Sequence, residues 1–302
     1  MEQSQNITHI IKNIEQALLV RYNDQYLCQQ YAWWMLQAIT KKTHTQLLAH
    51  QTVQLTAQQK AQLYDWIDRL VIDHKPLAYI LGKTPFSNLE ILIEPPILIP
   101  RPETEEWVIA FIEQLQKKIS EQTITILDLC SGSGCIGLAF AKAFPRARIY
   151  AVDISPIAIE LGKKNASHNG VTNITFIQSD LFTAIPEGLK FDIIVSNPPY
   201  IAQSEYEQLD PAVSKWEDKN ALVAPDNGLE LIEKIIIQAQ HYIKSSTTTI
   251  QQLGIEIGYQ QGPQVFQFMK SHGYTNVQVN KDLQGNDRFV TGRINRVAQT
   301  GS

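Results

Sequence analysis

The chain has 302 residues, of which 44% are hydrophobic and 19% are charged, and this balance excludes a protein that is mainly disordered. Its formal net charge of -4 does not favour a broad basic surface that holds nucleic acid. Cys28, Cys130 and Cys135 show neither metal-ligand spacing nor a disulfide pattern, which fits a reducing compartment. Neither a signal-peptide pattern nor a membrane-spanning apolar stretch occurs. We therefore expect a cytoplasmic protein with no membrane association and no metal site.

Residues 1–75 are expected to form a small helical domain. Their apolar side chains recur three and four positions apart in three ranges: 7–18, 31–38 and 63–70. Thr56 is followed three residues later by Gln59, which predicts a capping box at the start of the last helix. The tryptophans of this segment fit core packing, and the alternative is a face that binds a partner: Trp33, Trp34 and Trp66.

Residues 76–106 change to short apolar runs that prolines interrupt. The stretch LEILIEPPILIPRPETE contains four prolines, and each of them opposes a helix. Residues 89–93 carry the apolar pattern of a short strand. This segment is therefore predicted to be a β-rich connector.

Residues 107–296 alternate between strand and helix patterns, and residues 297–302 form a tail. Strands are expected at TITILDL, RIYAVDI, ITFIQSD and FDIIVSN, with helices such as CIGLAFAKAF between them. The sequence then predicts helices at 229–243 and 263–273, and strands at 253–259, 275–282 and 288–293. Near-continuous apolar strands that alternate with helices are typical of an α/β fold with a parallel sheet covered on both faces.

The stretch ILDLCSGSGCIGLAF joins a strand, a glycine-rich turn and a helix. Gly132 and Gly134 can adopt backbone angles that other residues avoid, and they let a ligand approach the main chain. Asp128, Asp153 and Asp180 lie in or just after three successive strands, so their carboxylates are expected at one edge of the sheet. Asp153 can accept from both hydroxyls of a ribose, whereas Asp128 lies in an apolar run and needs donors that the turn's N–H groups can supply. We expect a nucleotide-like ligand here, and the alternative is a turn that needs small residues only for packing.

The stretch NPPY follows the fourth of these strands, at the same edge of the sheet. The Asn197 side-chain oxygen and the Pro198 carbonyl can each accept a proton from an –NH2 group. The two prolines fix the backbone and remove N–H donors, and Tyr200 can lie flat against a planar group. The expected guest is the planar –NH2 of an amide or a base, held in line with the methyl group of a sulfonium. The alternative is a plain turn at the end of a strand.

Taken together, these motifs resemble one family. DLCSGSG, AVD, SNPPY, the connector IPRPETE, LAYILG, NDRFVTGR and the preceding helical segment resemble the bacterial release-factor glutamine methyltransferases of the PrmC/HemK family, over nearly the whole chain. The resemblance implies a class I S-adenosylmethionine-dependent methyltransferase fold: a doubly wound, mostly parallel seven-stranded sheet with a small N-terminal helical domain. It also implies methyl transfer from S-adenosylmethionine to N5 of the glutamine in the Gly-Gly-Gln motif of peptide chain release factors.

The resemblance also implies roles for individual residues. Those implied to bind the donor lie in the turn and after the strands: Cys130, Ser131, Gly132, Ser133, Gly134, Asp153, Asp180, Leu181 and Asn197. Those implied to hold the target glutamine are Asn197, Pro198, Pro199 and Tyr200, of which Asn197, Pro198 and Tyr200 are the candidate catalytic residues. Arg101 and Glu103 either clamp the substrate loop or pair with each other. This chain departs from the family at Cys130, where Gly is common, and at Leu181, where an aromatic residue is common; both departures bear on donor affinity.

Other functions and partners follow from the same motifs. The resemblance implies that the helical domain contacts the release factor, and we expect a monomer with no nucleic-acid substrate. The alternatives are a methyltransferase that acts on a ribosomal-protein glutamine, or on an exocyclic amine of a nucleic-acid base, because NPPY also suits base amines. A nicotinamide dehydrogenase explains the G-x-G-x-x-G match and Asp153 but not NPPY.

Overall fold

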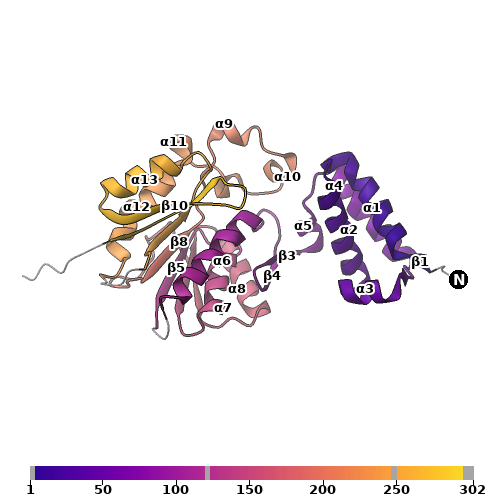
Figure 1. Ribbon diagram of the computed structural model, residues 1–302, viewed down its shortest axis with the longest axis horizontal. Coiled ribbons are helices and arrows are strands. Elements are labelled where there is room, and N and C mark those ends of the chain that lie inside the picture. The colour runs from indigo at the N-terminus through magenta and orange to yellow at the C-terminus, as the bar shows by residue number, and fades with distance from the viewer. Residues whose placement is uncertain (1–3, 120–122, 246–249, 295–302) are drawn as a thin grey trace, which may run out of the picture. The chain divides into compact units, whose positions relative to one another are not determined.

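The computed structural model describes residues 4–119, 123–245 and 250–294 (Figure 1). The chain divides into a helical unit, Met1–Gly82 with Pro211–Trp216, and a sheet unit, Lys83–Asp210 with Glu217–Ser302. The sequence patterns gave no sign that the short segment 211–216 belongs with the helices. The tail predicted for residues 297–302 lies outside the described residues, and the exact domain boundaries stay a prediction. Within the described parts of the chain, no helix has the length and apolar character that crossing a membrane requires.

The helical unit is built from helices that pack around one apolar core. These helices are α1 (Ile7–Tyr22), α2 (Gln25–Thr40), α3 (His44–His50), α4 (Ala57–Val71) and α5 (Leu77–Leu81). The short α10 (Pro211–Ser214) belongs to the same unit but buries none of its residues. A two-stranded sheet joins β1 (Gln5–Asn6) to β2 (Thr52–Val53). The capping box of Thr56 and Gln59 is confirmed at the start of α4. Trp33, Trp34 and Trp66 are partly buried and pack against the core, as the core-packing interpretation predicted.

The sheet unit contains the predicted mostly parallel sheet of seven strands, in the order β10-β11-β9-β8-β5-β6-β7. The strands are β5 (Thr125–Leu129), β6 (Arg148–Asp153), β7 (Ile174–Gln178), β8 (Ile193–Ser196), β9 (Leu253–Glu256), β10 (Tyr274–Lys281) and β11 (Asp287–Ile294). β5 to β9 run parallel to one another, and β11 pairs in antiparallel fashion with both β9 and β10. The chain reverses its direction across the sheet between β7 and β8, so β5 and β8 lie side by side at the switch point where ligands bind in such folds.

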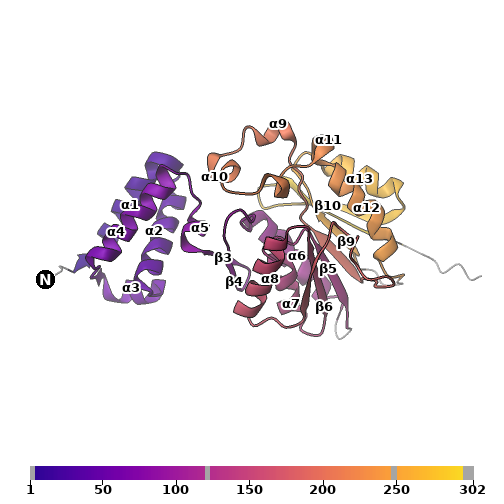
Figure 2. The same cartoon turned by 180° about the vertical axis from the view of Figure 1, so that it is seen from behind.

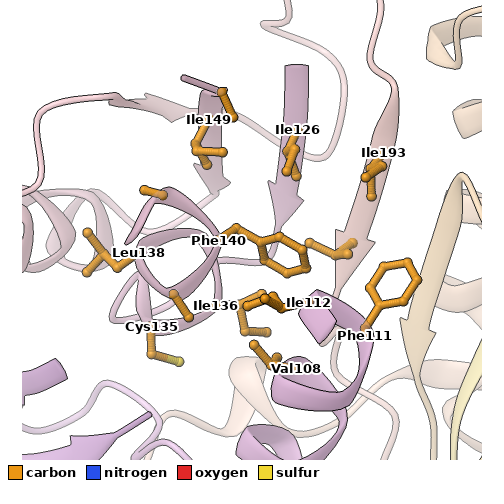
Figure 3. Close-up of a cluster of buried hydrophobic side chains, with 14 of the residues drawn as sticks. Val108, Phe111, Ile112, Ile126, Cys135, Ile136, Leu138, Phe140, Ile149 and Ile193 are labelled. Atoms are coloured by element: carbon orange, nitrogen blue, oxygen red, sulfur yellow. The ribbon is translucent and has the colours of Figure 1, made fainter. Parts of the chain in front are cut away.

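Helices cover both faces of the sheet because alternate side chains of each strand point to opposite sides (Figure 2). The longer helices of the unit are α6 (Pro102–Gln116), α7 (Cys135–Ala143), α8 (Pro156–His168), α12 (Glu230–Tyr242) and α13 (Gly262–Ser271). In β5, Ile126 packs with α6 and α7 on one face (Figure 3), and Leu127 packs with α12 and α13 on the other. Both residues are fully buried, which contributes about 1.5–3 kcal/mol for each such side chain.

The segment expected to be a β-rich connector is only partly so. It contains the hairpin of β3 (Lys83–Phe86) and β4 (Leu89–Leu92), which confirms the strand predicted at residues 89–93. However, α5 lies at its start, and α6 begins at Pro102. The expectation that every proline opposes a helix was wrong at Pro102, because a proline in the first helical turn loses no intrahelical hydrogen bond. The loop after NPPY carries only short helices: α9 (Gln203–Tyr206), α10, a 3-10 turn (Lys219–Ala221) and α11 (Pro225–Gly228).

Candidate active site

The predicted site residues meet at the carboxyl ends of the parallel strands. The register pairs Leu129 of β5 with Val152 of β6 and with Ser196 of β8. Cys130, Asp153 and Asn197 each come next along the chain, so the glycine-rich turn, the acidic residue and the start of NPPY lie at one edge. A ligand that binds at this edge can reach all three segments at once.

The backbone of the glycine-rich turn adopts left-handed conformations. Its φ angles are 59° at Cys130, 53° at Gly132 and 81° at Gly134. A Cβ atom on Gly132 would meet no atom within 4 Å, so the turn is open at that point. A Cβ atom on Gly134 would lie 3.1 Å from Phe176, so this glycine is required by packing as well as by its backbone angle. The packing alternative therefore applies to Gly134, while Gly132 leaves room for a ligand to approach the main chain.

Asp153 is joined to the turn by hydrogen bonds from the main chain. Its Oδ2 accepts from the Gly132 N–H at 2.8 Å, and its Oδ1 accepts from the Ser155 N–H at 2.9 Å. Burial raises the pKa of Asp153, and these N–H donors oppose that rise. Each carboxylate oxygen keeps a second lone pair, so Asp153 can still accept from a hydroxyl. The next residue, Ile154, is apolar yet 64% exposed, and the sequence patterns did not single it out.

Asp128 is fully buried in β5 and is held by a different donor from the one expected. Its Oδ2 accepts from the Gly137 N–H at 2.8 Å, and this donor lies in the first turn of α7, not in the glycine-rich turn. The expectation that the turn's own N–H groups supply the donors was therefore wrong. Its Oδ1 is buried and has no hydrogen-bond partner in the described residues. Burial raises the pKa of Asp128 to about 8, so this carboxyl is largely protonated at neutral pH.

The other residues assigned to the donor differ in exposure. Asp180 is exposed, whereas Leu181 is 8% exposed and has a φ of 46°, a left-handed conformation that is rare for leucine. Ser131 and Ser133 are buried, and the Ser131 hydroxyl has no hydrogen-bond partner in the described residues. Sequence reasoning missed Asn165 in α8, which donates to the Ser133 carbonyl at 2.9 Å and also pairs with the backbone of β4. Asn165 thus ties the glycine-rich turn, at Ser133, to the backbone of β4.

The NPPY segment is held by side chains from distant parts of the chain. The Asn197 Nδ2 donates to the Thr104 Oγ1 at 3.3 Å. Pro198 is buried, and Pro199 and Tyr200 are half-buried. The Tyr200 hydroxyl donates to the Glu256 Oε1 at 3.2 Å, and burial next to this acidic group raises the pKa of Tyr200. The phenol is therefore neutral and fixed.

Glu256 is a buried carboxylate that sequence reasoning missed. It ends β9 and is 1% exposed. Its Oε2 accepts from the Thr104 hydroxyl at 2.8 Å and from the Trp107 indole N–H at 2.6 Å. Burial raises its pKa, and these hydrogen bonds oppose that rise. An available signal was the acidic residue inside the apolar run LGIEIGY, the same kind of signal that marked Asp128.

Arg101 and Glu103 do not pair with each other in the structure. Arg101 forms an ion pair with Glu217, whose side chain is fully buried and whose Oε1 also accepts from the Ile99 N–H. Glu103 lines a surface cavity between α6 and the β10–β11 hairpin. The pairing alternative was therefore wrong, because Glu217 from the loop after NPPY takes the guanidinium.

Comparison with known proteins now defines the class. Residues 108–215 match the family model of the methyltransferase small domain, and residues 13–82 match that of the PrmC N-terminal domain. The catalytic domain of hMettl16, solved with the MAT2A 3′UTR hairpin 6, has a similar fold, with a TM-score of 0.55, 14% identity and coverage of 82% of this chain and 85% of that one. The sheet order and these matches define a methyltransferase.

The relatives define the family. This chain is 37% identical to the release factor glutamine methyltransferase of Escherichia coli (strain K12), over 86% of this chain and 90% of that protein. It is 35% identical to the enzyme of the same name from Salmonella typhimurium, with the same coverage. The chain belongs to the family of release factor glutamine methyltransferases.

Proposed function

We propose that this protein transfers a methyl group from S-adenosylmethionine to the side-chain amide nitrogen, N5, of the glutamine in the Gly-Gly-Gln motif of peptide chain release factors. The observation that carries the proposal is the position of Asn197: β8, which NPPY follows, pairs with β5, which the glycine-rich turn follows. An amide acceptor and a donor can therefore lie side by side. The names of the relatives support the same substrate.

The residues around the turn fit the methyl donor. Gly132 leaves open space above the main chain, and the buried Ser131 hydroxyl has a free hydrogen-bonding capacity. The Asp153 carboxylate would accept from the ribose hydroxyls, and the exposed Ile154 offers an apolar contact for the adenine ring. Cys130, Ser133, Gly134, Asp180 and Leu181 would complete the cradle. The donor supplies an electrophilic methyl group on a sulfonium.

The NPPY segment would hold and orient the target amide. The Asn197 Nδ2 is already bonded to Thr104, which leaves the Asn197 Oδ1 to accept one amide proton, and the Pro198 carbonyl would accept the other. Pro199 stiffens the segment, and Tyr200 would lie against the planar amide. Such a nitrogen is a poor nucleophile, so orientation in line with the methyl group is what this chain contributes. Arg101, through its ion pair with Glu217, and Glu103 would shape the approach of the substrate loop.

The test compares substrate classes under one set of conditions. The protein is incubated with isotopically labelled S-adenosylmethionine and, separately, with an intact release factor, ribosomal proteins, tRNA and DNA. We expect label in the release factor alone, lost when its Gly-Gly-Gln glutamine is replaced by alanine, and mapped by mass spectrometry to that glutamine. Preferential labelling of a ribosomal protein or of a nucleic-acid base amine would replace this proposal with the corresponding alternative.

The helical unit would contact the release factor, and the protein would act as a cytoplasmic monomer without a nucleic-acid substrate. A shortened protein that begins at Lys83 keeps the β3–β4 hairpin and its bonds to Asn165. It should still bind the donor but lose most of its activity on intact release factor. Full activity of the shortened protein would contradict the docking role. Analytical ultracentrifugation at the protein concentration of the methylation assay tests whether the protein is a monomer.

A further inference from the structure

Glu256 lies level with Asn197 in the sheet. The register pairs Ser196 of β8 with Ile255 of β9, so the next residues of the two parallel strands, Asn197 and Glu256, come to the same edge. Glu256 is nevertheless 1% exposed, which keeps it beneath the surface that a substrate could touch. Its contacts to the NPPY segment run through Thr104 and through the Tyr200 hydroxyl.

Two hydrogen bonds link Asn197 to Glu256 through the Thr104 hydroxyl, and each has a fixed direction. The Trp107 indole N–H can only donate, so the Glu256 Oε2 that it contacts must be an acceptor. The same oxygen accepts the Thr104 hydroxyl proton at 2.8 Å. The Thr104 hydroxyl has only one proton, so its oxygen can only accept from Asn197.

This direction decides which way the Asn197 carboxamide faces. The –NH2 end must lie on Thr104, because a carbonyl oxygen placed there would meet an oxygen with no proton to give. The Asn197 Oδ1 is then left as the acceptor for the substrate amide. A carboxamide turned by 180° would present N–H groups to the substrate –NH2, and two donors repel each other. The direction holds with Glu256 ionised, because both oxygens of a carboxylate can then only accept.

Tyr200 is fixed by the other oxygen of the same carboxylate. Its hydroxyl donates to the Glu256 Oε1 at 3.2 Å, and its carbonyl accepts from the Gln261 Nε2 at 3.0 Å. The Tyr200 backbone also lies so close to Gly228 that a Cβ atom there would come within 1.8 Å of the Tyr200 carbonyl oxygen. Glu256 thus holds both ends of the NPPY segment: Asn197 through Thr104, and Tyr200 directly.

We propose that Glu256 is a positioning residue, which orients the Asn197 carboxamide through Thr104 and fixes Tyr200 directly. The inference deepens the proposed function and rests on it: methylation of an amide nitrogen requires an acceptor at Asn197, and Glu256 sets that polarity. Glu256 is buried and would touch neither the substrate nor the donor.

The sharpest test compares Thr104→Val with Trp107→Phe. Each variant removes one donor to the same Glu256 oxygen, but only Thr104 also contacts Asn197. We expect Thr104→Val to lower the single-turnover methylation rate about tenfold, the effect of one lost orienting hydrogen bond, with donor affinity unchanged. Trp107→Phe should keep its rate within about threefold of the wild type. Equal losses of rate in the two variants, or no loss in Thr104→Val, would overturn the positioning role.

A second test uses Glu256 itself. In Glu256→Gln, the Trp107 N–H still selects the carbonyl oxygen at the Oε2 position, so Thr104 keeps its direction and the rate should stay within a few-fold of the wild type. In the double variant Glu256→Gln with Trp107→Phe, that selection is lost, and the rate should fall by more than the product of the two single effects. Additive effects in this cycle would contradict the proposed polarity.

A readout without methylation separates this inference from the proposed function. In protein labelled with 15N at asparagine, the Asn197 side-chain –NH2 signals are assigned from their loss in Asn197→Ala. They should move and exchange faster with water in Thr104→Val but not in Trp107→Phe. If the wild type fails to methylate release factors but the signals respond in this way, the proposed function fails and the positioning stands. If Thr104→Val leaves the signals unchanged, the positioning fails whatever the substrate is.

Discussion

The donor side and the acceptor side of the candidate site are held together by different kinds of bonds. On the donor side, main-chain N–H groups donate to carboxylates that are near in sequence: Gly137 to Asp128, nine residues apart, and Gly132 to Asp153, 21 apart. On the acceptor side, side chains bond to side chains across 93 residues, from Asn197 to Thr104, and across 152, from Thr104 to Glu256.

The comparison separates two ways of building a site. A strand, a turn and a helix that follow each other in the chain are enough to place main-chain donors around a ligand. Orientation of a reacting amide needs the direction of each hydrogen bond to be fixed, and only side chains with unequal donor and acceptor capacity can do this. Changes on the acceptor side should therefore affect rate, and changes on the donor side should affect donor affinity and stability.

Asn197→Ala should give the largest effect. It removes the acceptor for the substrate amide without changing the turn, so the methylation rate should fall by about two orders of magnitude or more, roughly 3 kcal/mol of transition-state stabilisation. Single-turnover kinetics and calorimetry with the donor test this together, because donor affinity should be retained. A variant with wild-type turnover, or one that loses donor binding and rate in parallel, would break the division between the two sides.

Asp153→Ala should act on the donor side alone. It removes the acceptor for the ribose hydroxyls and also frees the Gly132 N–H. Hydrogen bonds to a charged group contribute roughly 1.5–3 kcal/mol, so donor affinity should fall by about 10- to 150-fold. The rate at saturating donor should fall much less. Unchanged affinity by calorimetry, or tighter binding of a nicotinamide dinucleotide than of S-adenosylmethionine, would count against the assignment.

Asp128 should make stability depend on pH. Its pKa is about 8 in the folded protein against an ordinary value of 3.8, so between these values the folded protein holds a proton that the unfolded chain has lost. Its contribution to stability is complete at low pH and is lost as pH rises through this window, by about 1.4 kcal/mol per pH unit at most. Asp128→Asn has no titrating group at this position, so this pH-dependent contribution to stability is absent from the variant. Urea unfolding at a series of pH values should show that the wild type loses stability relative to Asp128→Asn from about pH 5 to pH 7; a constant difference in the free energy of unfolding would refute the shifted pKa.

Cys130→Gly should give the smallest effect, and it should be a gain. Cys130 has a φ of 59°, a conformation that costs a non-glycine residue roughly 1–2 kcal/mol, and glycine removes this strain. The greater conformational entropy of glycine in the unfolded chain offsets part of that gain. A net stabilisation of about 0.5–1 kcal/mol is expected. Cys135→Gly is the matched control, since Cys135 begins α7 in a helical conformation and should lose stability. Thermal unfolding of both variants decides, and a loss in both would show that the Cys130 thiol packing outweighs the backbone strain.

The sequence by itself determined the alternating strands and helices, the glycine-rich turn with Asp153, and the NPPY segment. Each of these is a local pattern: apolar periodicity, left-handed glycines or a run of prolines acts on neighbouring residues. The strand predicted at residues 89–93 and the capping box of Thr56 and Gln59 were confirmed for the same reason.

Only the tertiary structure decided which side chains support the site. Thr104 lies in the same motif as Arg101 and Glu103, and Trp107 follows the end of that motif by two residues; periodicity gives no reason to prefer one pair over the other. The helix that starts at Pro102 turns Thr104 and Trp107 inward, and the order of strands brings Glu256 of β9 next to β8. A buried carboxylate tells the reader of a sequence that donors must exist, as at Asp128 and Glu256. The sequence does not show which groups donate, because in the folded sheet the donors can come from residues far away in the chain.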